Sequence, residues 1–316
     1  MADTATLETP GRAVRVARAG KELFPAAPGP DGGGPEKAVT KEDLAAYHRD
    51  IAPFMLPHLS DRPLMLEIHP DGIDGQRFMQ KNVPAHYPDW VHRAELPKEG
   101  GTVTHVLADS AATLVYLAGQ GCTTLHRWLS RADRPRSPDL MVFDLDPSGG
   151  DLAEGFAQAR RAARRLAELL EELGLPWAPM TSGSRGLHVL VPLVRRADVD
   201  EVRDFARETA DVLAGRFPDE LTTQARKDAR GDRLYLDVQR NGYAQTAVAP
   251  WTVRALPGAP VAAPFAPDGL DDPRLGPRRW TLRTALGQAR TDPWSHLPAR
   301  ARGLGPARRK LRALAE

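Results

Sequence analysis

The spacing of hydrophobic residues along the chain predicts a mixture of helices and strands. Residues 151–173 have apolar side chains at three- and four-residue intervals, which is the pattern of an amphipathic helix with one buried face. Asp151 precedes this segment as an N-cap, Glu154 follows three residues later, and Gly174 ends the helix. The predicted buried stripe consists of Leu152, Phe156, Ala159, Ala163, Leu166, Leu170 and Leu173.

Several shorter patterns predict further elements. Thr40, followed three residues later by Asp43, predicts the start of a helix that runs to about Leu59. We also expect helices at 109–119, 123–130 and 198–215, and strands at 62–69, at 187–193 and around Asp144 and Asp237. Loops are expected at 25–38 and 71–81, and a loose N-terminus at 1–12. Helices and strands that alternate irregularly favour an α/β or α+β fold.

Three aspartates lie on these predicted strands. Asp144 and Asp146 end an apolar strand and, because strand side chains alternate, they point to the same side, with Cα atoms about 6–7 Å apart. Asp237 lies in a second apolar segment and projects from the face opposite its leucines. Three carboxylates on one surface repel each other unless a cation neutralises them. This pattern indicates a two-metal site for phosphoryl or nucleotidyl transfer.

The residues alone leave alternative roles open for the aspartates. An Asp-x-Asp pair also occurs in glycosyltransferases, in haloacid-dehalogenase phosphatases and in solvated turns. Pro147 follows the pair here, whereas those phosphatases have Gly-Thr. Two unpaired carboxylates at the end of an apolar strand are costly to bury, which favours metal binding over a structural role.

Two polar segments accompany the aspartates. Residues 181–186 supply hydroxyls, one guanidinium and flexible backbone N–H groups, which suit a triphosphate, although a polar turn explains them too. His188 follows within the next strand, where a core histidine is equally common. Residues 226–233 place four cations before Asp237, and Arg240 lies three residues after it.

The segment 75–81 contains one aromatic residue among polar and charged ones. Phe78 beside Lys81 can stack on an exposed base while the lysine meets a phosphate. A loop that is simply anchored by its aromatic residue is the alternative.

Composition limits the environment and the partners. Cys122 is the only cysteine, which excludes an intramolecular disulfide and favours a reducing, cytoplasmic setting. No segment is long and apolar enough to cross a membrane, so no membrane partner is expected. The formal net charge is +2, but residues 271–316 contain eleven Arg or Lys and four Asp or Glu. This basic end either neutralises phosphates or forms a solvated amphipathic helix.

An ordered set of these segments resembles a known family. Residues 143–147, 181–188, 237–241 and 246–255 look like the polymerase domain of bacterial DNA ligase D, in the archaeo-eukaryotic primase superfamily. The segments 21–25, 40–44 and 55–64 are similar as well. The resemblance extends from about Lys21 to Leu297.

The resemblance implies an α+β primase-polymerase fold, with central, mostly antiparallel sheets flanked by helices. An N-terminal lobe at about 13–100 would pack on a catalytic core at about 101–300, followed by a basic tail at 301–316. It implies template-directed extension of a DNA 3′ end, with ribonucleotides preferred and Mn²⁺, or Mg²⁺, as the two divalent metal ions. The family role is gap filling in double-strand break repair by non-homologous end joining.

Roles of individual residues also follow from the resemblance. Asp144, Asp146 and Asp237 would be catalytic metal ligands. The incoming nucleotide would contact His126, Ser182, Arg185, His188, Arg230, Arg240 and Arg254. Lys21 and Lys41 would bind the 5′-phosphate across a gap, and Phe78 and Lys81 would meet the template strand.

Some features depart from the family pattern. Arg185 replaces the usual lysine, Met79 replaces an aromatic residue, and an insertion at 29–38 separates Lys21 from Lys41. The chain lacks a Lys-x-Asp-Gly ligase sequence, so we expect a stand-alone polymerase at the bacterial nucleoid that meets Ku and a DNA ligase as separate proteins. De novo primer synthesis and a non-catalytic DNA-end-bridging role are the alternative functions.

Overall fold

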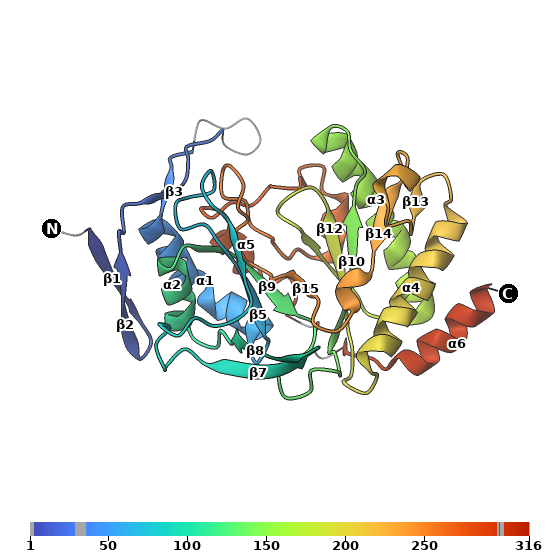
Figure 1. The fold of residues 1–316 in the computed structure, drawn as a ribbon. Coiled ribbons are helices and arrows are strands. Elements are labelled where there is room, and N and C mark those ends of the chain that lie inside the picture. The colour runs from blue at the N-terminus through green and yellow to red at the C-terminus, as the bar shows by residue number, and fades with distance from the viewer. Residues whose placement is uncertain (1–2, 29–35, 296, 298–299, 316) are drawn as a thin grey trace. The chain divides into compact units, whose positions relative to one another are not determined.

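The computed structural model describes residues 3–28, 36–295, 297 and 300–315, and the chain forms two compact units (Figure 1). The first unit contains the described residues up to Trp128, together with Val248–Ala263 and Arg278–Asp292. The second contains Leu129–Ala247, Pro264–Pro277 and the described residues after Pro293. The boundary expected near residue 100 therefore lies at Trp128, and two later segments return to the first unit.

The second unit is built on a five-stranded sheet with the order β11-β12-β10-β14-β13. Its strands are β10 (Leu140–Asp146), β11 (Ala178–Thr181), β12 (Leu187–Pro192), β13 (Leu221–Thr222) and β14 (Leu234–Asp237). Neighbouring strands are antiparallel except β13 and β14, which are parallel. The central position of β10 places its two aspartates between the neighbouring strands β12 and β14.

Three helices belong to this unit: α3 (Leu152–Leu173), α4 (Val199–Arg216) and α6 (Leu304–Ala315). The N-cap of α3 is Asp151, whose side chain accepts hydrogen bonds from the N–H groups of Ala153 and Glu154, and Gly174 ends the helix at φ 77°. Both α3 and α4 contact β10, and α6 contacts α3 and α4. The 3₁₀ helices are η2 (Lys227–Ala229), η3 (Gln239–Asn241) and η4 (Pro267–Asp271).

The basic C-terminal segment is a helix with one buried face. Leu304, Ala307 and Leu311 are buried, while Arg309 and Arg312 of α6 are exposed. The sequence allowed either a phosphate-neutralising segment or a solvated amphipathic helix, and the structure of this segment is an amphipathic helix. Its neutralisation of phosphates stays a prediction.

The first unit contains a four-stranded sheet with the order β15-β9-β5-β6. Its strands are β5 (Leu64–Ile68), β6 (Phe78–Gln80), β9 (Cys122–Trp128) and β15 (Thr246–Val248). The helices are α1 (Lys41–Leu59), α2 (Ala111–Gly119) and the short α5 (Ala285–Ala289), and α1 packs against α2. The expected capping box at Thr40 and Asp43 is confirmed. Three two-stranded sheets complete the unit: β1 (Thr4–Thr9) with β2 (Arg12–Ala17), β3 (Glu22–Phe24) with β4 (Val39–Thr40), and β7 (Arg93–Lys98) with β8 (Gly101–Val106).

Three expectations were wrong in this unit. Residues 123–130, predicted as a helix, lie largely in β9; every residue of this strand except His126 is buried, so no alternation was visible in the sequence. Residues 78–80, predicted as loop, form β6 at the edge of the sheet. The N-terminus, predicted as loose over 1–12, forms β1 and the start of β2 within its described part, with Leu7 and Val14 buried.

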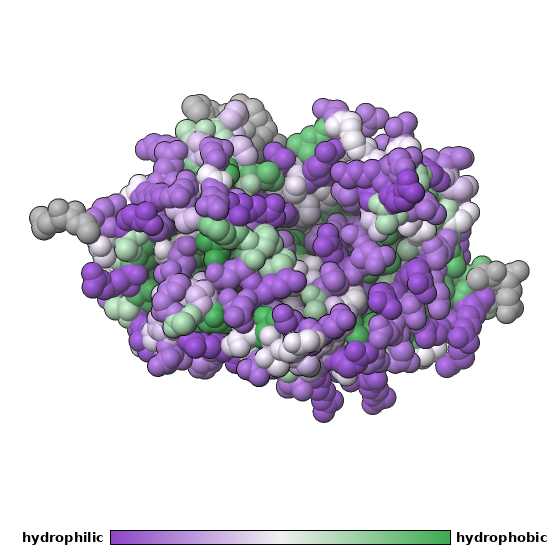
Figure 2. Space-filling model, in the orientation of Figure 1, coloured by the Kyte–Doolittle hydropathy of each residue, from purple (hydrophilic) through white to green (hydrophobic). Residues whose placement is uncertain are grey.

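The observed elements make an α+β fold with mostly antiparallel sheets, as the family resemblance implied. Within the described part of the chain, no helix combines the length and hydrophobicity needed to cross a bilayer. The visible surface is mostly hydrophilic, with smaller hydrophobic areas between (Figure 2).

Candidate active site

Two of the three aspartates stand directly opposite each other on neighbouring strands. Asp144 of β10 pairs with Asp237 of β14, and Asp146 pairs with Tyr235. Direct cross-strand partners have Cβ atoms about 4.5–5.5 Å apart, so the first two carboxylates share a small volume. Leu145, on the opposite face of β10, is fully buried, as the alternation predicted. The sheet thus gathers all three carboxylates on one surface of the second unit.

Positive side chains neutralise part of the negative charge of this surface. The Nε atom of Arg240 lies 3.8 Å from Oδ2 of Asp144 and 3.6 Å from Oδ2 of Asp237. The Nη1 atom of Arg230 lies 3.4 Å from Oδ2 of Asp146. These two arginines are therefore next to the carboxylates, as expected, and their contact with a nucleotide stays a prediction.

The neighbouring negative charge affects the pKa of Asp146. Burial and the neighbouring Asp144 carboxylate raise the pKa of Asp146, and the charges of Arg230 and Arg185 oppose this only in part. Its side chain is 49% exposed, so water and added ions can reach it. A divalent cation at this position would relieve the repulsion that the arginines leave.

The carboxylates suit hard divalent cations because their oxygens are the ligands that Mg²⁺ and Mn²⁺ prefer. Across the described ranges, no three histidine, cysteine or acidic side chains already stand in a metal-binding arrangement. Arg240 instead bridges Asp144 and Asp237, and its guanidinium stands in for a cation there. The Arg240 side chain is 44% exposed, so it would be able to move into solvent if a metal ion were held by these carboxylates. The donor set therefore suits hard divalent cations, and metal binding stays a prediction.

One buried residue that sequence reasoning missed holds the strands of the site together. The side-chain amide of Asn241 donates to the carbonyl oxygens of Val142, at 2.7 Å, and Val238, at 2.9 Å. Its Oδ1 accepts from the N–H of Val142 at 2.8 Å. Asn241 thus continues the β10–β14 pairing past Asp144 and fixes the segment after Asp237. The sequence showed an asparagine after Arg240 but gave no sign of its partner 99 residues away.

The predicted phosphate loop is a tight turn between β11 and β12. The Ser182 hydroxyl accepts hydrogen bonds from the N–H groups of Gly186, at 3.1 Å, and Ser184, at 3.3 Å. Ser182 is buried, so it shapes this turn as well as being a candidate phosphate contact. A Cβ atom at position 186 would lie closer to the Leu145 carbonyl oxygen than any real Cβ atom lies to a backbone atom. This close approach explains why residue 186 is a glycine.

His188 enters the site from β12. It pairs with Asp144 across the strands, and its Nε2 atom lies 3.4 Å from Oδ1 of Asp144. The side chain is buried, and its Nδ1 atom has no hydrogen-bond partner within the described chain. This geometry makes His188 a neighbour of a candidate metal ligand, and a direct phosphate contact stays a prediction.

A pocket of about 500 Å³ opens beside Asp146. Three cations line it, Arg185, Lys227 and Arg230, together with the acidic residues Asp146, Glu154 and Asp232. Arg185 donates to the Gly149 carbonyl oxygen at 2.7 Å, while its Nε atom is buried with no protein partner in the part of the chain that the structure describes. The N-terminus of α3, where the N–H groups of Ala153 and Glu154 donate to Asp151, adds its positive dipole end. This arrangement can hold a polyanion next to the carboxylates.

Lys227 and the start of α3 were not singled out from the sequence as site features. The signal for the helix start was present, because Gly149 and Gly150 precede the N-cap Asp151 in the manner of anion-binding turns. Lys227 was visible only as one of several cations before Asp237. Lys227 differs from Arg226 and Arg233 in that it lines the pocket beside Asp146.

The remaining predicted nucleotide contacts belong to the first unit. His126 lies on β9, with its Nε2 atom 3.4 Å from Oε2 of Glu67. The Oγ1 atom of Thr124 donates to the Val253 carbonyl oxygen at 2.7 Å, which fixes the segment before Arg254 next to the same strand. The first unit therefore gathers His126 and Arg254 around β9.

The two lysines predicted to bind a 5′-phosphate lie together despite the insertion between them. The N–H of Lys41 donates to the Lys21 carbonyl oxygen at 2.8 Å. Burial, together with the charges of Arg18 and Lys21, lowers the pKa of Lys41. Lys21 forms an ion pair with exposed Asp71. The three cations form a basic cluster on the first unit.

The predicted template contacts stand on β6 and just after it. The side chains of Phe78 and Met79 are 44% and 42% exposed, and Lys81 is also exposed. Phe78 therefore does not anchor its segment by burial, which removes the structural alternative for this residue. An exposed aromatic residue beside a lysine keeps the stacking interpretation open.

Comparison with known proteins gives consistent matches. Residues 40–294 match the family described as LigD, primase-polymerase domain. The chain is 32% identical over 271 residues to the multifunctional non-homologous end joining DNA repair protein LigD of Mycobacterium tuberculosis, covering 83% of this chain and 34% of that protein. It is 31% identical over 280 residues to LigD of Pseudomonas aeruginosa, covering 87% of this chain and 33% of that protein.

A solved structure matches as well. The polymerase domain from Mycobacterium tuberculosis ligase D in complex with DNA has a TM-score of 0.78 and 30% sequence identity to this chain, covering 90% of this chain and 97% of that one. The chain thus spans about a third of the length of the curated relatives and nearly the whole of the solved polymerase domain.

Proposed function

Because this chain belongs to the LigD primase-polymerase family, we propose that it is a template-dependent nucleotidyltransferase that extends a DNA 3′ end. The observation that carries this proposal is the pairing of Asp144 with Asp237 across β10 and β14, with Asp146 on the same surface. Three carboxylates in this arrangement, beside a pocket to which three cations contribute, suit transfer of a nucleotidyl group from a triphosphate.

The carboxylates would hold two divalent cations, Mn²⁺ or Mg²⁺. When bound, these ions supply the positive charge that activates the primer 3′-hydroxyl and neutralises the triphosphate. His188 orients Asp144 through its Nε2 atom. Asn241 keeps β10 and the segment after Asp237 in register, so that the carboxylates converge.

The pocket beside Asp146 would receive the phosphates of the incoming nucleotide. Arg185, Lys227 and Arg230 supply three positive charges there. Arg230 is held firmly, since it also donates to the carbonyl oxygens of Gln224 and Ala225 and stacks 4.0 Å from the Tyr235 ring centroid. Preorganised cations of this kind stabilise developing charge without reorganising during the reaction. His126 and Arg254 are the candidate nucleotide contacts of the first unit.

DNA contacts are proposed for the first unit. The basic cluster of Arg18, Lys21 and Lys41 suits a 5′-phosphate at the far side of a gap. Exposed Phe78 with Lys81 suits the template strand. The solved relative was observed in complex with DNA, and the curated relatives are named for non-homologous end joining. We therefore place this chain in gap filling during end joining, with ribonucleotides preferred and with Ku and a DNA ligase as partners.

Primer extension on a gapped duplex with a 5′-phosphate, Mn²⁺ and nucleoside triphosphates tests the proposal. We expect extension by the wild type, faster with ribonucleotides than with deoxyribonucleotides, and slower when the 5′-phosphate is absent. The Asp144→Ala/Asp146→Ala variant should not extend the primer, whereas Asp219→Ala, which changes an exposed aspartate elsewhere in the second unit, should match the wild type. Equal extension by the wild type and the double variant would refute the proposal.

A further inference from the structure

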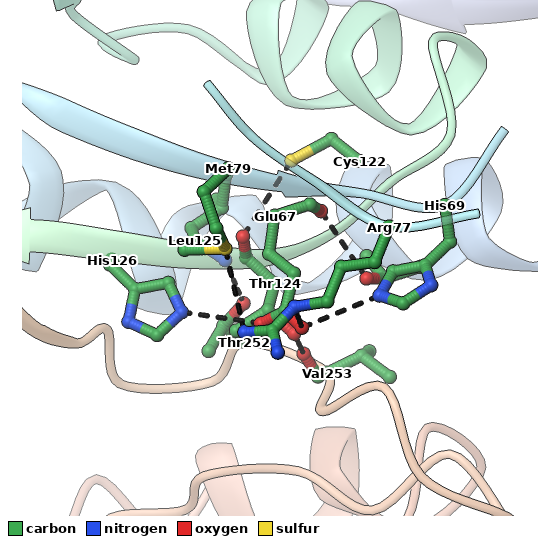
Figure 3. A network of polar contacts seen from close by, with 11 residues as sticks. Glu67, His69, Arg77, Met79, Cys122, Thr124, Leu125, His126, Thr252 and Val253 are labelled. Carbon is green, nitrogen blue, oxygen red and sulfur yellow. Dashed lines mark hydrogen bonds and ion pairs between the residues drawn. The ribbon is translucent and has the colours of Figure 1, made fainter. Parts of the chain in front are cut away.

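A buried carboxylate in the first unit connects two groups that have separate proposed roles. Glu67 lies on β5, the strand between β9 and β6, and pairs with Thr124 of β9 and Met79 of β6. His126, a candidate nucleotide contact, comes from β9. Arg77 precedes β6, which carries the candidate template contact Phe78 (Figure 3).

Each oxygen of Glu67 has a partner. Oε2 lies 3.4 Å from Nε2 of His126. Oε1 lies 2.9 Å from Nε of Arg77 and 3.3 Å from Nε2 of His69. The Arg77 guanidinium also contacts the Met79 sulfur at 3.5 Å, so it ties the carboxylate to β6. Figure 3 shows these side chains converging on Glu67.

The carboxylate is a fixed negative charge in a buried position. Its residue is 6% exposed. Burial by itself would raise the pKa of Glu67, but hydrogen bonds with His126 and His69 and the charge of Arg77 outweigh it and lower the pKa to about 2. A buried carboxylate that stays ionised holds its partners in place, because its removal would take a charged hydrogen-bond acceptor away from His126, His69 and Arg77.

We propose that Glu67 is a positioning residue that sets the orientation of His126 for the nucleotide and, through Arg77, the position of β6 for the template strand. This inference rests on the proposed function, since it assumes that His126 meets the nucleotide and that Phe78 meets the template. One carboxylate would then support both substrate contacts, each through a different oxygen. The contact of Glu67 with Arg77 is expected to be weaker than its contact with His126, because the Arg77 side chain is 58% exposed.

The carboxylate can be tested with the isosteric Glu67→Gln substitution and with substitutions of its partners. We expect Glu67→Gln to raise the KM for the nucleoside triphosphate about tenfold, the effect of weakening one hydrogen bond to a charged group, while kcat changes much less. In a His126→Ala background the same substitution should leave this KM nearly unchanged. Arg77→Ala should weaken binding of primer-template DNA without changing the nucleotide KM.

Controls separate positioning from folding. Glu95→Gln, which changes an exposed glutamate on β7, should behave as the wild type in every assay. Urea unfolding of each variant identifies any loss of folded protein. The inference is overturned if folded Glu67→Gln has the wild-type KM and DNA affinity, or if its effect on KM is as large in the His126→Ala background as in the wild type.

A measurement made without substrate distinguishes failure of this inference from failure of the proposed function. The imidazole nitrogen signals of ¹⁵N-histidine protein can be recorded without any substrate, and His126→Ala identifies the signals of that residue. We expect Glu67→Gln to shift the His126 and His69 signals. Unshifted signals would overturn the inference even if the wild type extends primers, whereas shifted signals with no extension would count against the function alone.

Discussion

Replacing Gly186 by alanine should disrupt the turn that brings Ser182 and Arg185 to β10. The glycine lies against the end of β10, where a Cβ atom would stand 3.2 Å from the Leu145 carbonyl carbon, 3.3 Å from Cδ of Pro147, and closer still to the Leu145 oxygen. Ordinary van der Waals contacts of a Cβ atom begin at 3.4 Å. Since the nearest group is backbone, the turn or β10 itself must move.

The magnitude follows from overpacking. Forcing a methyl group into a well-packed site costs about 1–3 kcal/mol. Alanine also restricts the unfolded chain, which offsets about 0.4–1 kcal/mol of that cost. The difference between these two terms predicts that Gly186→Ala lowers the free energy of unfolding by up to about 2.6 kcal/mol. The displaced turn should also bind nucleoside triphosphate more weakly.

Urea unfolding measures the first effect, and titration with a nucleoside triphosphate measures the second. Gly215→Ala is the matched control, because that glycine lies in the last turn of α4 with no atom within 4 Å of an added Cβ. There alanine should be neutral or stabilising by up to about 1 kcal/mol. If Gly186→Ala were as stable as Gly215→Ala and bound nucleotide as the wild type does, the close approach of this turn to β10 would be refuted.

Two further predictions concern the carboxylate site. Asn241→Ala removes three hydrogen bonds and leaves the buried backbone of Val142 unpaired, so urea unfolding should show a free energy of unfolding lower by about 2–4 kcal/mol. The control Asn82→Ala loses one exposed hydrogen bond and should cost less than about 1 kcal/mol. A smaller cost for Asn241→Ala than for Asn82→Ala would contradict this prediction. The raised pKa of Asp146 means that its ionisation costs stability as pH rises above the ordinary value of 3.8, and that this cost is absent at lower pH. Asp146→Asn should therefore raise the Tm at about pH 7 and change it little at about pH 3, and a Tm increase that is larger at the lower pH would contradict the assignment.

The sequence predicted best the features that depend on local pattern. The amphipathic period of residues 151–173 and their caps predicted α3 to within one residue. The alternation of side chains along a strand predicted that Asp144 and Asp146 share a face. These rules act over a few residues, so a single sequence contains them in full.

Features that depend on distant partners could not be predicted in the same way. The strand β9 is buried on both faces, which conceals the alternation by which strands are recognised. Asn241 and Glu67 look like ordinary polar residues until their partners on other strands are known. The proximity of Lys21 to Lys41 likewise depends on the pairing of β3 with β4 and not on the length of the insertion between them.

The most direct test of the central claim is the rate of template-directed extension by Asp237→Asn. This substitution keeps the shape of the side chain opposite Asp144 and removes its charge. With saturating Mn²⁺, nucleoside triphosphate and gapped DNA, we predict a loss of at least about a hundredfold in rate, on the scale of losing an essential electrostatic contribution to the transition state, while the protein stays folded. Extension by folded Asp237→Asn at the wild-type rate would show that the three paired-strand carboxylates are not the catalytic centre.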